Sequence, residues 1–178
     1  ASLHETIIKM AQVHIGSNNL NWLFPSGQFG SRLSNRSEHG APRYLHTRMD
    51  DVTKIVFNEL DEPLLDLVED DGKTVEPVYY VPIIPTILVN GSEGIGTGWS
   101  TDIPSYNPEE LATIYKDVLN GVQTLESAAE NLRPWFKGFK GSVVKNSEKD
   151  NYFDVKGIWE KTSYGLKITE LPISADKL

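Results

Sequence analysis

The spacing of apolar residues predicts a short amphipathic helix at the beginning of the chain. In "ASLHETIIKMAQ", Leu3, Ile7 and Ala11 recur every four residues, and polar residues occupy the other faces. This period places the apolar side chains on one side of a helix. Because only Ala1 and Ser2 stand before it, without a complete helix-start signal, we expect the sequence to be an excerpt of a longer polypeptide.

The most complete helix signal covers residues 107–121. Asn107 can cap the first turn, and Pro108 suits the first helical position. Two glutamates then favour the positive end of the helix dipole. Gly121 is typical of a helix end, so the start and the stop of this helix are both marked.

Two further helices are predicted in the acidic part of the chain. Apolar residues recur at helical spacing over residues 50–60, and Asp50 or Asp51 lies near the helix start. We interpret the following stretch "PLLDLVEDDG" as a shorter helix that ends at Gly72. The inward residues of the first of these helices are Val52, Ile55, Val56 and Leu60.

The remaining pattern predicts turns and short strands. Residues 16–42 are rich in Gly, Ser, Asn and Pro, which is typical of loops. Residues 75–90 have an extended pattern, but three prolines restrict it to short edge strands. Residues 141–171 alternate in three short runs separated by polar turns, as in an antiparallel meander. The pattern as a whole predicts an α+β fold of two units that meet near residue 102.

The charge distribution leaves a nucleic-acid partner possible despite a net charge of −8. Residues 1–48 hold five Lys and Arg against two acids, whereas residues 49–77 hold ten acids against two lysines. The acidity is thus concentrated in one block, and the start of the chain is basic. The absence of cysteine mildly favours an intracellular compartment, and no apolar run reaches the roughly 18 residues of a membrane span.

The glycine-rich stretch "ILVNGSEGIGTGWS" at 87–100 suggests a phosphate-binding loop at first sight. Gly91 and Gly96 have the separation of a P-loop, but the required lysine does not follow them. The dinucleotide fingerprint fails as well, because it requires glycine where Trp99 stands. Two interpretations remain. One is a tight turn, and the other is an apolar wedge for DNA that consists of Ile95 on a very open backbone.

Four motifs, in this order along the chain, resemble one protein family. They are "GSNNLNWLFPSGQFGSRL" at 16–33, "APRYLHT" at 41–47, "VEPVYYVPIIPTILVNGSEGIGTGWST" at 75–101 and "ITELP" at 168–172. Together they closely resemble the DNA-cleavage region of type IIA DNA topoisomerases. The run "PSGQFGSRL" and the ending "EGIGTGWS" are similar to the eukaryotic topoisomerase II branch, which also occurs in some large DNA viruses. The resemblance extends over essentially the whole chain.

The resemblance implies a particular domain arrangement. Residues 1–102 would form a winged-helix domain that is truncated at its N-terminus and carries the catalytic tyrosine. Residues 103–178 would form the beginning of the tower, an α/β domain with an antiparallel sheet that lengthens the DNA-binding channel.

The resemblance also implies the catalytic residues, Tyr44 and Arg43. In the family the tyrosine hydroxyl attacks a DNA phosphodiester and forms a 5′-phosphotyrosyl bond. The bond is exchanged and not hydrolysed, so the break can be resealed without an external energy source. The neighbouring guanidinium can hold the phosphate oxygens and offset charge in the transition state.

Five further residues are expected to contact DNA. The family uses the isoleucine of "EGIG" to wedge between base pairs and help bend the duplex, which implies this role for Ile95. Gln28 and Arg32 are expected near the cleaved strand or its backbone, and Lys9 is expected to approach it from the first helix. Many relatives have a Gly-Gly-Lys segment before the Arg-Tyr pair. This chain lacks that segment, and Arg36 is the candidate for the missing positive charge.

Cofactors and partners follow from the resemblance alone. The intact enzyme would be an isomerase that binds double-stranded DNA, acts as a homodimer and uses Mg²⁺ and ATP held by other domains. Residues 1–178 are expected to bind neither cofactor and to lack cleavage activity alone. The acidic block at 49–77 is interpreted as a solvated face. The expected location is the nucleus, or the infected host cell if the protein is viral.

Two other functions are compatible with parts of the sequence. One is a DNA-bending or scaffold module derived from a topoisomerase, which would need no catalytic tyrosine. The other is a small nucleotide-binding enzyme that uses the glycine stretch, and the missing lysine argues against it.

Overall fold

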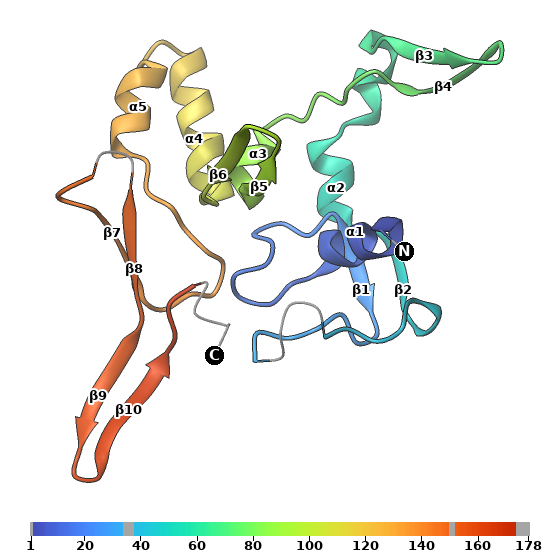
Figure 1. The fold of residues 1–178 in the computed structure, drawn as a ribbon. Coiled ribbons are helices and arrows are strands. Elements are labelled where there is room, and N and C mark those ends of the chain that lie inside the picture. Colours follow the sequence, from blue (N-terminus) through green and yellow to red (C-terminus); the bar gives the residue numbers. More distant parts are fainter. Residues whose placement is uncertain (1, 34–37, 150–151, 174–178) are drawn as a thin grey trace.

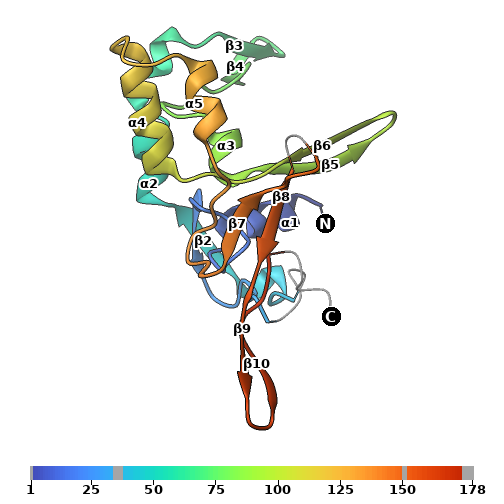
Figure 2. The same cartoon turned by 90° about the vertical axis from the view of Figure 1, so that its left-hand side faces the viewer.

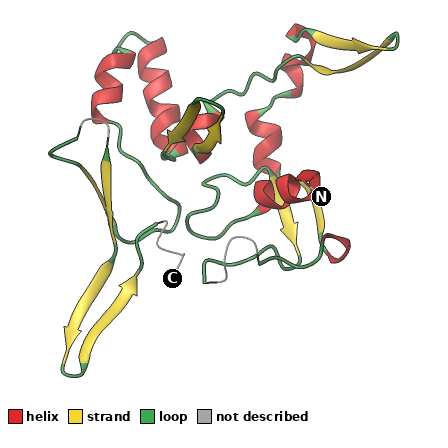
Figure 3. Cartoon of the chain, in the orientation of Figure 1, coloured by secondary structure: helices red, strands yellow, loops and turns green. Residues whose placement is uncertain are grey.

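The chain folds into short helices and antiparallel β-hairpins (Figure 1). The computed structural model describes residues 2–33, 38–149 and 152–173. Within these residues the strands form five separate two-stranded sheets, and all five are antiparallel. The mixture of helices and antiparallel strands confirms the expected α+β class (Figure 3).

The N-terminal part is built on helix α1 (Ser2–Ala11) and the sheet of β1 (Leu23–Ser26) and β2 (His46–Met49). The predicted amphipathic helix is therefore confirmed. Its residues Ile8 and Ala11 form a small core with Phe29, and Leu23 and Leu45 pack against that core. Burial of a side chain such as Phe29 contributes roughly 1.5–3 kcal/mol. The core thus holds together the first helix, the first sheet and the loop between the strands.

Helix α2 (Asp51–Val56) confirms the helix predicted from residue 50, although it is shorter than expected. Asp50 is its N-cap, and the carboxylate of Asp50 accepts a hydrogen bond from the backbone N–H of Val52. A 3₁₀ turn, η2 (Glu59–Leu64), follows after a break at residues 57 and 58.

The helix predicted to end at Gly72 is wrong. Its place is taken by a hairpin of β3 (Leu67–Asp70) and β4 (Lys73–Pro77). Asp71 and Gly72 form the two-residue turn, and both have positive φ, 48° and 73°. An Asp-Gly pair with this backbone favours a hairpin strongly, and this local signal outweighs the apolar spacing.

The extended prediction for residues 75–90 holds only in part, because Thr86–Asn90 form the short helix α3. Tertiary contacts account for the difference. Val89 is fully buried, and the Asn90 side chain exchanges two hydrogen bonds with the backbone of Leu20, at 2.8 and 3.0 Å. These long-range contacts hold the end of α3 against the first loop.

The C-terminal part begins with α4 (Pro108–Leu119), and the structure confirms both its predicted start and its predicted stop. The Asn107 side chain accepts a hydrogen bond from the backbone N–H of Glu109, and Gly121 follows the helix with a φ of 70°. Helix α5 (Leu125–Asn131), which the sequence pattern did not predict, lies beside α4 in both views (Figures 1 and 2).

The predicted meander at 141–171 is confirmed as antiparallel but is divided into two hairpins. Strands β7 (Ser142–Lys145) and β8 (Phe153–Lys156) form the first, and β9 (Ile158–Thr162) and β10 (Gly165–Glu170) form the second. The second hairpin extends away from the rest of the molecule in both views (Figures 1 and 2). In the part of the chain that the structure describes, no helix combines the length and apolar character needed to cross a membrane.

The side chain of Asn19, in the first loop, binds backbone groups from residue 89 to residue 137. Its buried side-chain amide donates hydrogen bonds to the carbonyl oxygens of Val89, Tyr106 and Trp135, at 2.9–3.0 Å. Its side-chain oxygen accepts a hydrogen bond from the backbone N–H of Lys137 at 2.8 Å. One amide therefore connects the first loop, α3 and the segment after α5.

Candidate nucleic-acid interface

Tyr44 occupies the last position of η1 (Pro42–Tyr44), a single 3₁₀ turn. Pro42 is favourable at the start of such a turn because its φ is already fixed. The backbone N–H of Tyr44 donates to the carbonyl of Ala41 at 2.9 Å, which closes the turn. The Tyr44 side chain is 68% exposed. Its hydroxyl can therefore meet a large substrate without any rearrangement of the core.

The residue after the tyrosine fixes this turn to the core. Leu45 packs against the cluster that contains Phe29 and Ile8. Gly27 lies so close to Leu45 that a Cβ at residue 27 would be 3.0 Å from Leu45 Cδ2. Gly27 also has a φ of 122°, which L side chains rarely adopt. An anchored leucine thus sets the direction in which Tyr44 leaves the surface.

Arg43 lies against the tyrosine ring. Its guanidinium carbon is 4.9 Å from the centre of the Tyr44 ring, within the range of a cation–π contact. The contact stabilises a cation beside the phenol, and the exposed guanidinium keeps donors available for an anion.

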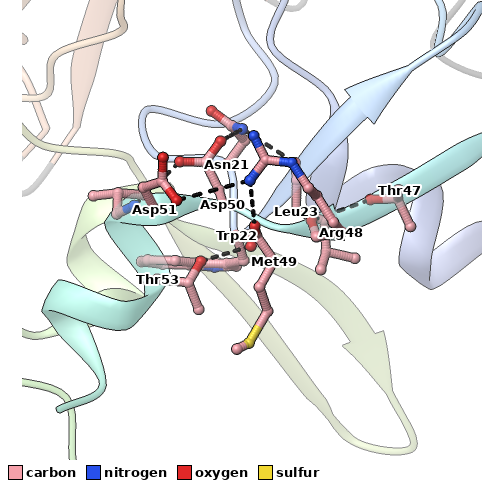
Figure 4. A network of polar contacts seen from close by, with 10 residues as sticks. Asn21, Trp22, Leu23, Thr47, Arg48, Met49, Asp50, Asp51 and Thr53 are labelled. Atoms are coloured by element: carbon pink, nitrogen blue, oxygen red, sulfur yellow. Dashed lines mark hydrogen bonds and ion pairs between the residues drawn. The ribbon is translucent and has the colours of Figure 1, made fainter. Parts of the chain in front are cut away.

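A hydrogen-bond network joins strand β1 to the start of α2 (Figure 4). The Asn21 side chain donates to the carboxylate of Asp50 at 3.0 Å and to the carbonyl of Leu23 at 3.1 Å. The Thr53 hydroxyl donates to the carbonyl of Trp22 at 2.6 Å. These bonds connect the N-terminus of α2 to β1. Strand β2, which follows Tyr44, is therefore anchored by Leu45 before it and by Asp50 after it.

Two other residues predicted to contact DNA lie within the described part of the chain, and a third does not. Gln28 and Lys9 have exposed side chains, and the Gln28 carbonyl accepts a hydrogen bond from the backbone N–H of Gly40 at 2.8 Å. That bond brings the segment before the Arg-Tyr pair next to residue 28. Arg36 lies outside the described residues.

Arg32 forms contacts within the chain, and its expected approach to DNA stays a prediction. Its guanidinium forms an ion pair with the Glu170 carboxylate, and it also donates to the carbonyl of Leu171 at 2.6 Å. The two side chains of the ion pair are only 16% and 6% exposed. In this conformation the charge of Arg32 is directed to a carboxylate within the chain.

Ile95 lies near the end of a second projecting element. Strands β5 (Ser92–Gly96) and β6 (Trp99–Ile103) form a hairpin, and Ile95 pairs with Ser100. The Ile95 side chain is 94% exposed, an unusual position for an isoleucine. The hairpin extends from the body of the molecule as a narrow arm (Figure 2).

The base of this arm requires a glycine. Gly91 has a φ of 71°, and a Cβ at this position would be 2.5 Å from the carbonyl oxygen of Ile103. The glycines of the stretch therefore permit a close approach of two backbones and a tight turn. Residues 92–103 form the β5–β6 hairpin, in which the two strands pair directly with each other.

The described residues do not form a metal site. Within 2–33, 38–149 and 152–173, no group of three or more His, Asp or Glu side chains is close enough to hold an ion. The acids of the block at 49–77 are distributed over the start of α2, the η2 region and the β3–β4 hairpin. The expectation that Mg²⁺ is held by another domain stays a prediction.

Sequence reasoning assigned no role to two residues that organise this region. Asn19 and Glu170 both lie inside quoted motifs, but their partners are far away in the sequence. Glu170 is separated from Arg32 by 138 residues, and Asn19 from Trp135 by 116. Only the tertiary structure connects them.

Comparison with known proteins identifies the class. The family model that describes the A subunits of DNA gyrase and topoisomerase IV matches residues 1–177. The chain belongs to this family of DNA topoisomerases.

Individual relatives fall in the eukaryotic branch that the motifs predicted. DNA topoisomerase 2 of Arabidopsis thaliana is 45% identical over 97% of the chain, and that of Candida albicans is 46% identical over 97%. The chain spans only 11–12% of the length of these two proteins. The predicted resemblance to eukaryotic topoisomerase II is thus confirmed for a short region of much longer relatives.

A solved structure supports the fold. The crystal structure of the DNA-binding, cleavage and re-ligation domain of Plasmodium falciparum topoisomerase II superposes with a TM-score of 0.89 at 43% identity. The match covers 98% of this chain and 23% of that one.

Proposed function

We propose that this chain is part of a type II DNA topoisomerase and carries the tyrosine that cleaves and religates double-stranded DNA. The observation that carries the proposal is the exposed Arg43–Tyr44 pair, which lies on an anchored turn in a chain of this family. The relatives named above support it, since they are DNA topoisomerases and one of them is described by its cleavage and re-ligation domain.

In the proposed reaction the Tyr44 phenolic oxygen attacks the phosphorus of a DNA phosphodiester. A bond forms between this oxygen and phosphorus, and the bond from phosphorus to the 3′ oxygen of the preceding nucleotide breaks. The phenol loses its proton, and the 3′ oxygen leaves as a hydroxyl group. The reverse attack by that hydroxyl restores the DNA strand and the free tyrosine.

Arg43 contributes charge stabilisation in this proposal. Negative charge accumulates on the phosphate oxygens in the transition state, and guanidinium N–H groups match their geometry. The cation–π contact with Tyr44 keeps the guanidinium next to the nucleophile before DNA arrives. Arg43 would then turn its donors to the phosphate when the duplex is bound.

Ile95 is proposed to act as the DNA wedge. An exposed apolar side chain at the end of a narrow hairpin can enter between base steps and unstack them. The bending costs about 1–6 kcal/mol by elastic estimates, and contacts along the bent duplex offset this cost. Lys9, Gln28 and Arg36 are proposed as additional contacts to the DNA strand.

The remaining assignments concern the whole protein. We propose a winged-helix domain over 1–102 and the beginning of a tower domain over 103–178. The complete enzyme is proposed to be a homodimer in the nucleus that uses ATP and Mg²⁺ bound outside this region. The eukaryotic origin of the named relatives supports the nucleus and gives no support to a viral source.

The direct test is Tyr44→Phe in the full-length protein. Covalent protein–DNA adducts should disappear, while salt-sensitive DNA binding persists, because only the hydroxyl is removed. Tyr164→Phe is the matched control, since Tyr164 is 99% exposed and lies in the turn of the β9–β10 hairpin. Adducts that persist in Tyr44→Phe would refute the proposal. If the protein is a scaffold without catalytic activity, neither the wild-type protein nor Tyr44→Phe would form adducts.

A further inference from the structure

The β9–β10 hairpin buries one carboxylate. Most residues of β10 are exposed, but Glu170 at its end is only 7% exposed. The strand register shifts between Ile168 and Glu170, which indicates a β-bulge. A bulge changes the direction of the side chain next to it. Here it accompanies the change from an exposed strand to an acid that points into the protein.

Gly157 allows the root of this hairpin to be compact. A Cβ at residue 157 would be 2.2 Å from the carbonyl oxygen of Glu170 and 3.1 Å from Pro172. Backbone atoms cannot move aside as the end of a flexible side chain can. The position of Glu170 is therefore fixed from its own hairpin.

Arg32 is the partner of this carboxylate. The ion pair and the bond from Arg32 to the Leu171 carbonyl use donors on both terminal nitrogens of the guanidinium. A charge buried with a charged partner is sensitive to the loss of that partner, because the remaining charge has left water. The contact therefore links the hairpin root to residues 27–33.

The residues just before Arg32 reach the core that anchors the tyrosine turn. The carbonyl of Phe29 accepts a hydrogen bond from the buried Gln12 side chain at 2.9 Å. The Phe29 ring belongs to the core on which Leu45 packs, and Leu45 directly follows Tyr44. The path from Glu170 to the tyrosine thus consists of an ion pair, the backbone from Arg32 to Phe29 and the apolar core on which Leu45 packs.

We propose that Arg32 and Glu170 are positioning residues for Tyr44, and that they couple the β9–β10 hairpin to the tyrosine turn. This inference rests on the proposed function. It gives Arg32 a role other than a direct DNA contact. The Glu170 carboxylate already compensates the charge of the Arg32 guanidinium. Burial of the ion pair also separates this guanidinium from a DNA phosphate.

A double-mutant cycle in the full-length enzyme tests the coupling. Glu170→Gln and Arg32→Lys each retain side-chain length and some hydrogen bonding, so the fold is expected to persist. Each variant should slow adduct formation at saturating DNA by about tenfold, with DNA affinity changed less than about twofold. The double variant should be no slower than the slower single variant, because both changes remove the same contact.

The hairpin also supplies a matched control. Lys167 and Glu160 form an exposed ion pair at 2.9 Å on the same two strands. Glu160→Gln removes that pair and should leave the rate of adduct formation unchanged, since exposed pairs contribute little. A general disturbance of the hairpin would slow both Glu160→Gln and Glu170→Gln, and that result would overturn the specific coupling.

Hydrogen exchange provides a measurement that does not depend on catalysis. Glu170→Gln should increase amide exchange in residues 41–47, more than one hundred residues away in sequence. Unchanged exchange there would overturn the inference even if Tyr44→Phe abolishes adducts. If Arg32 is a DNA contact instead, Arg32→Lys would weaken DNA binding with no effect of Glu170→Gln on either measurement. If adducts persist in Tyr44→Phe, the proposed function fails. The exchange measurement then still tests whether the β9–β10 hairpin is coupled to residues 41–47.

Discussion

The guanidinium of Arg43 lies over the ring of Tyr44, 4.9 Å from its centre, on a turn that the following residue anchors to the core. Two features follow from this arrangement. The phenol is exposed to a large substrate, and a permanent positive charge is adjacent to it before any DNA is bound.

Replacement of Arg43 by Lys should reduce the rate of adduct formation by about 10- to 100-fold. Lysine keeps the charge but lacks the planar fork of donors, so it stabilises the transition-state phosphate less well. DNA affinity should change little. The measurement is the single-turnover rate of covalent adduct formation in the full-length enzyme.

Arg48→Lys is a suitable control for that prediction. Arg48 also lies over an aromatic ring, with its guanidinium 4.7 Å from the centre of the Phe24 ring, and it belongs to the neighbouring strand β2. If Arg43→Lys and Arg48→Lys slow adduct formation equally, the slower rate is not caused by the proximity of Arg43 to Tyr44.

Replacement of Ile95 by Ala should reduce DNA bending. The smaller side chain cannot fill the space between separated base steps, so the bent state loses its apolar support. Energy transfer between dyes at the two ends of a short duplex measures the bend. Leu119→Ala removes a comparably exposed side chain at the end of α4 and should leave the bend unchanged. Equal bending by the wild-type and Ile95→Ala proteins would exclude Ile95 from the mechanism.

Replacement of Asn19 by Ala should destabilise the protein by about 2–4 kcal/mol. The substitution leaves three carbonyl groups and one N–H group without the partner that the amide provides. Calorimetry of the full-length protein should show a lower melting temperature for this region. Asn131→Ala removes an exposed hydrogen bond to Ser127 and should have a much smaller effect. Similar shifts in both variants would contradict the role of Asn19 as a joint.

Replacement of Gly27 by Ala should destabilise the tyrosine turn by about 1–3 kcal/mol. The new Cβ meets Leu45 at 3.0 Å on a backbone with positive φ. Gly121→Ala carries positive φ as well, but no atom lies within 4 Å of its Cβ position. Gly121→Ala should therefore cost less and leave adduct formation unchanged, whereas Gly27→Ala should slow it. An equal rate in the two variants would show that Leu45 does not transmit the change to Tyr44.

Local signals explain which elements could be predicted. The helix at Pro108–Leu119 has a cap, a proline at its start and a glycine beyond its end, and all of these operate within a few residues. The Asp71–Gly72 turn is equally local, and its hairpin signal is stronger than the apolar spacing before it. The hairpin at β3 and β4 could therefore have been found from sequence.

Long-range contacts explain what could not be predicted. The helix at Thr86–Asn90 is held by hydrogen bonds between Asn90 and Leu20, and no local sequence pattern predicts these bonds. Arg32 illustrates the same limit for the site. Its partner Glu170 is 138 residues away, so the ion pair has no local signal in the sequence. The motifs around Tyr44 and Ile95 indicated function through resemblance, since neither residue has a local chemical signature of its own.

The central claim concerns the atom that becomes bonded to DNA, and mapping of the adduct tests it most directly. The full-length enzyme is trapped on DNA and digested with protease and nuclease, and the peptides are sequenced by mass spectrometry. The account predicts a nucleotide phosphate on the peptide that contains Tyr44, attached to its phenolic oxygen. A phosphate adduct on any other peptide would contradict the account.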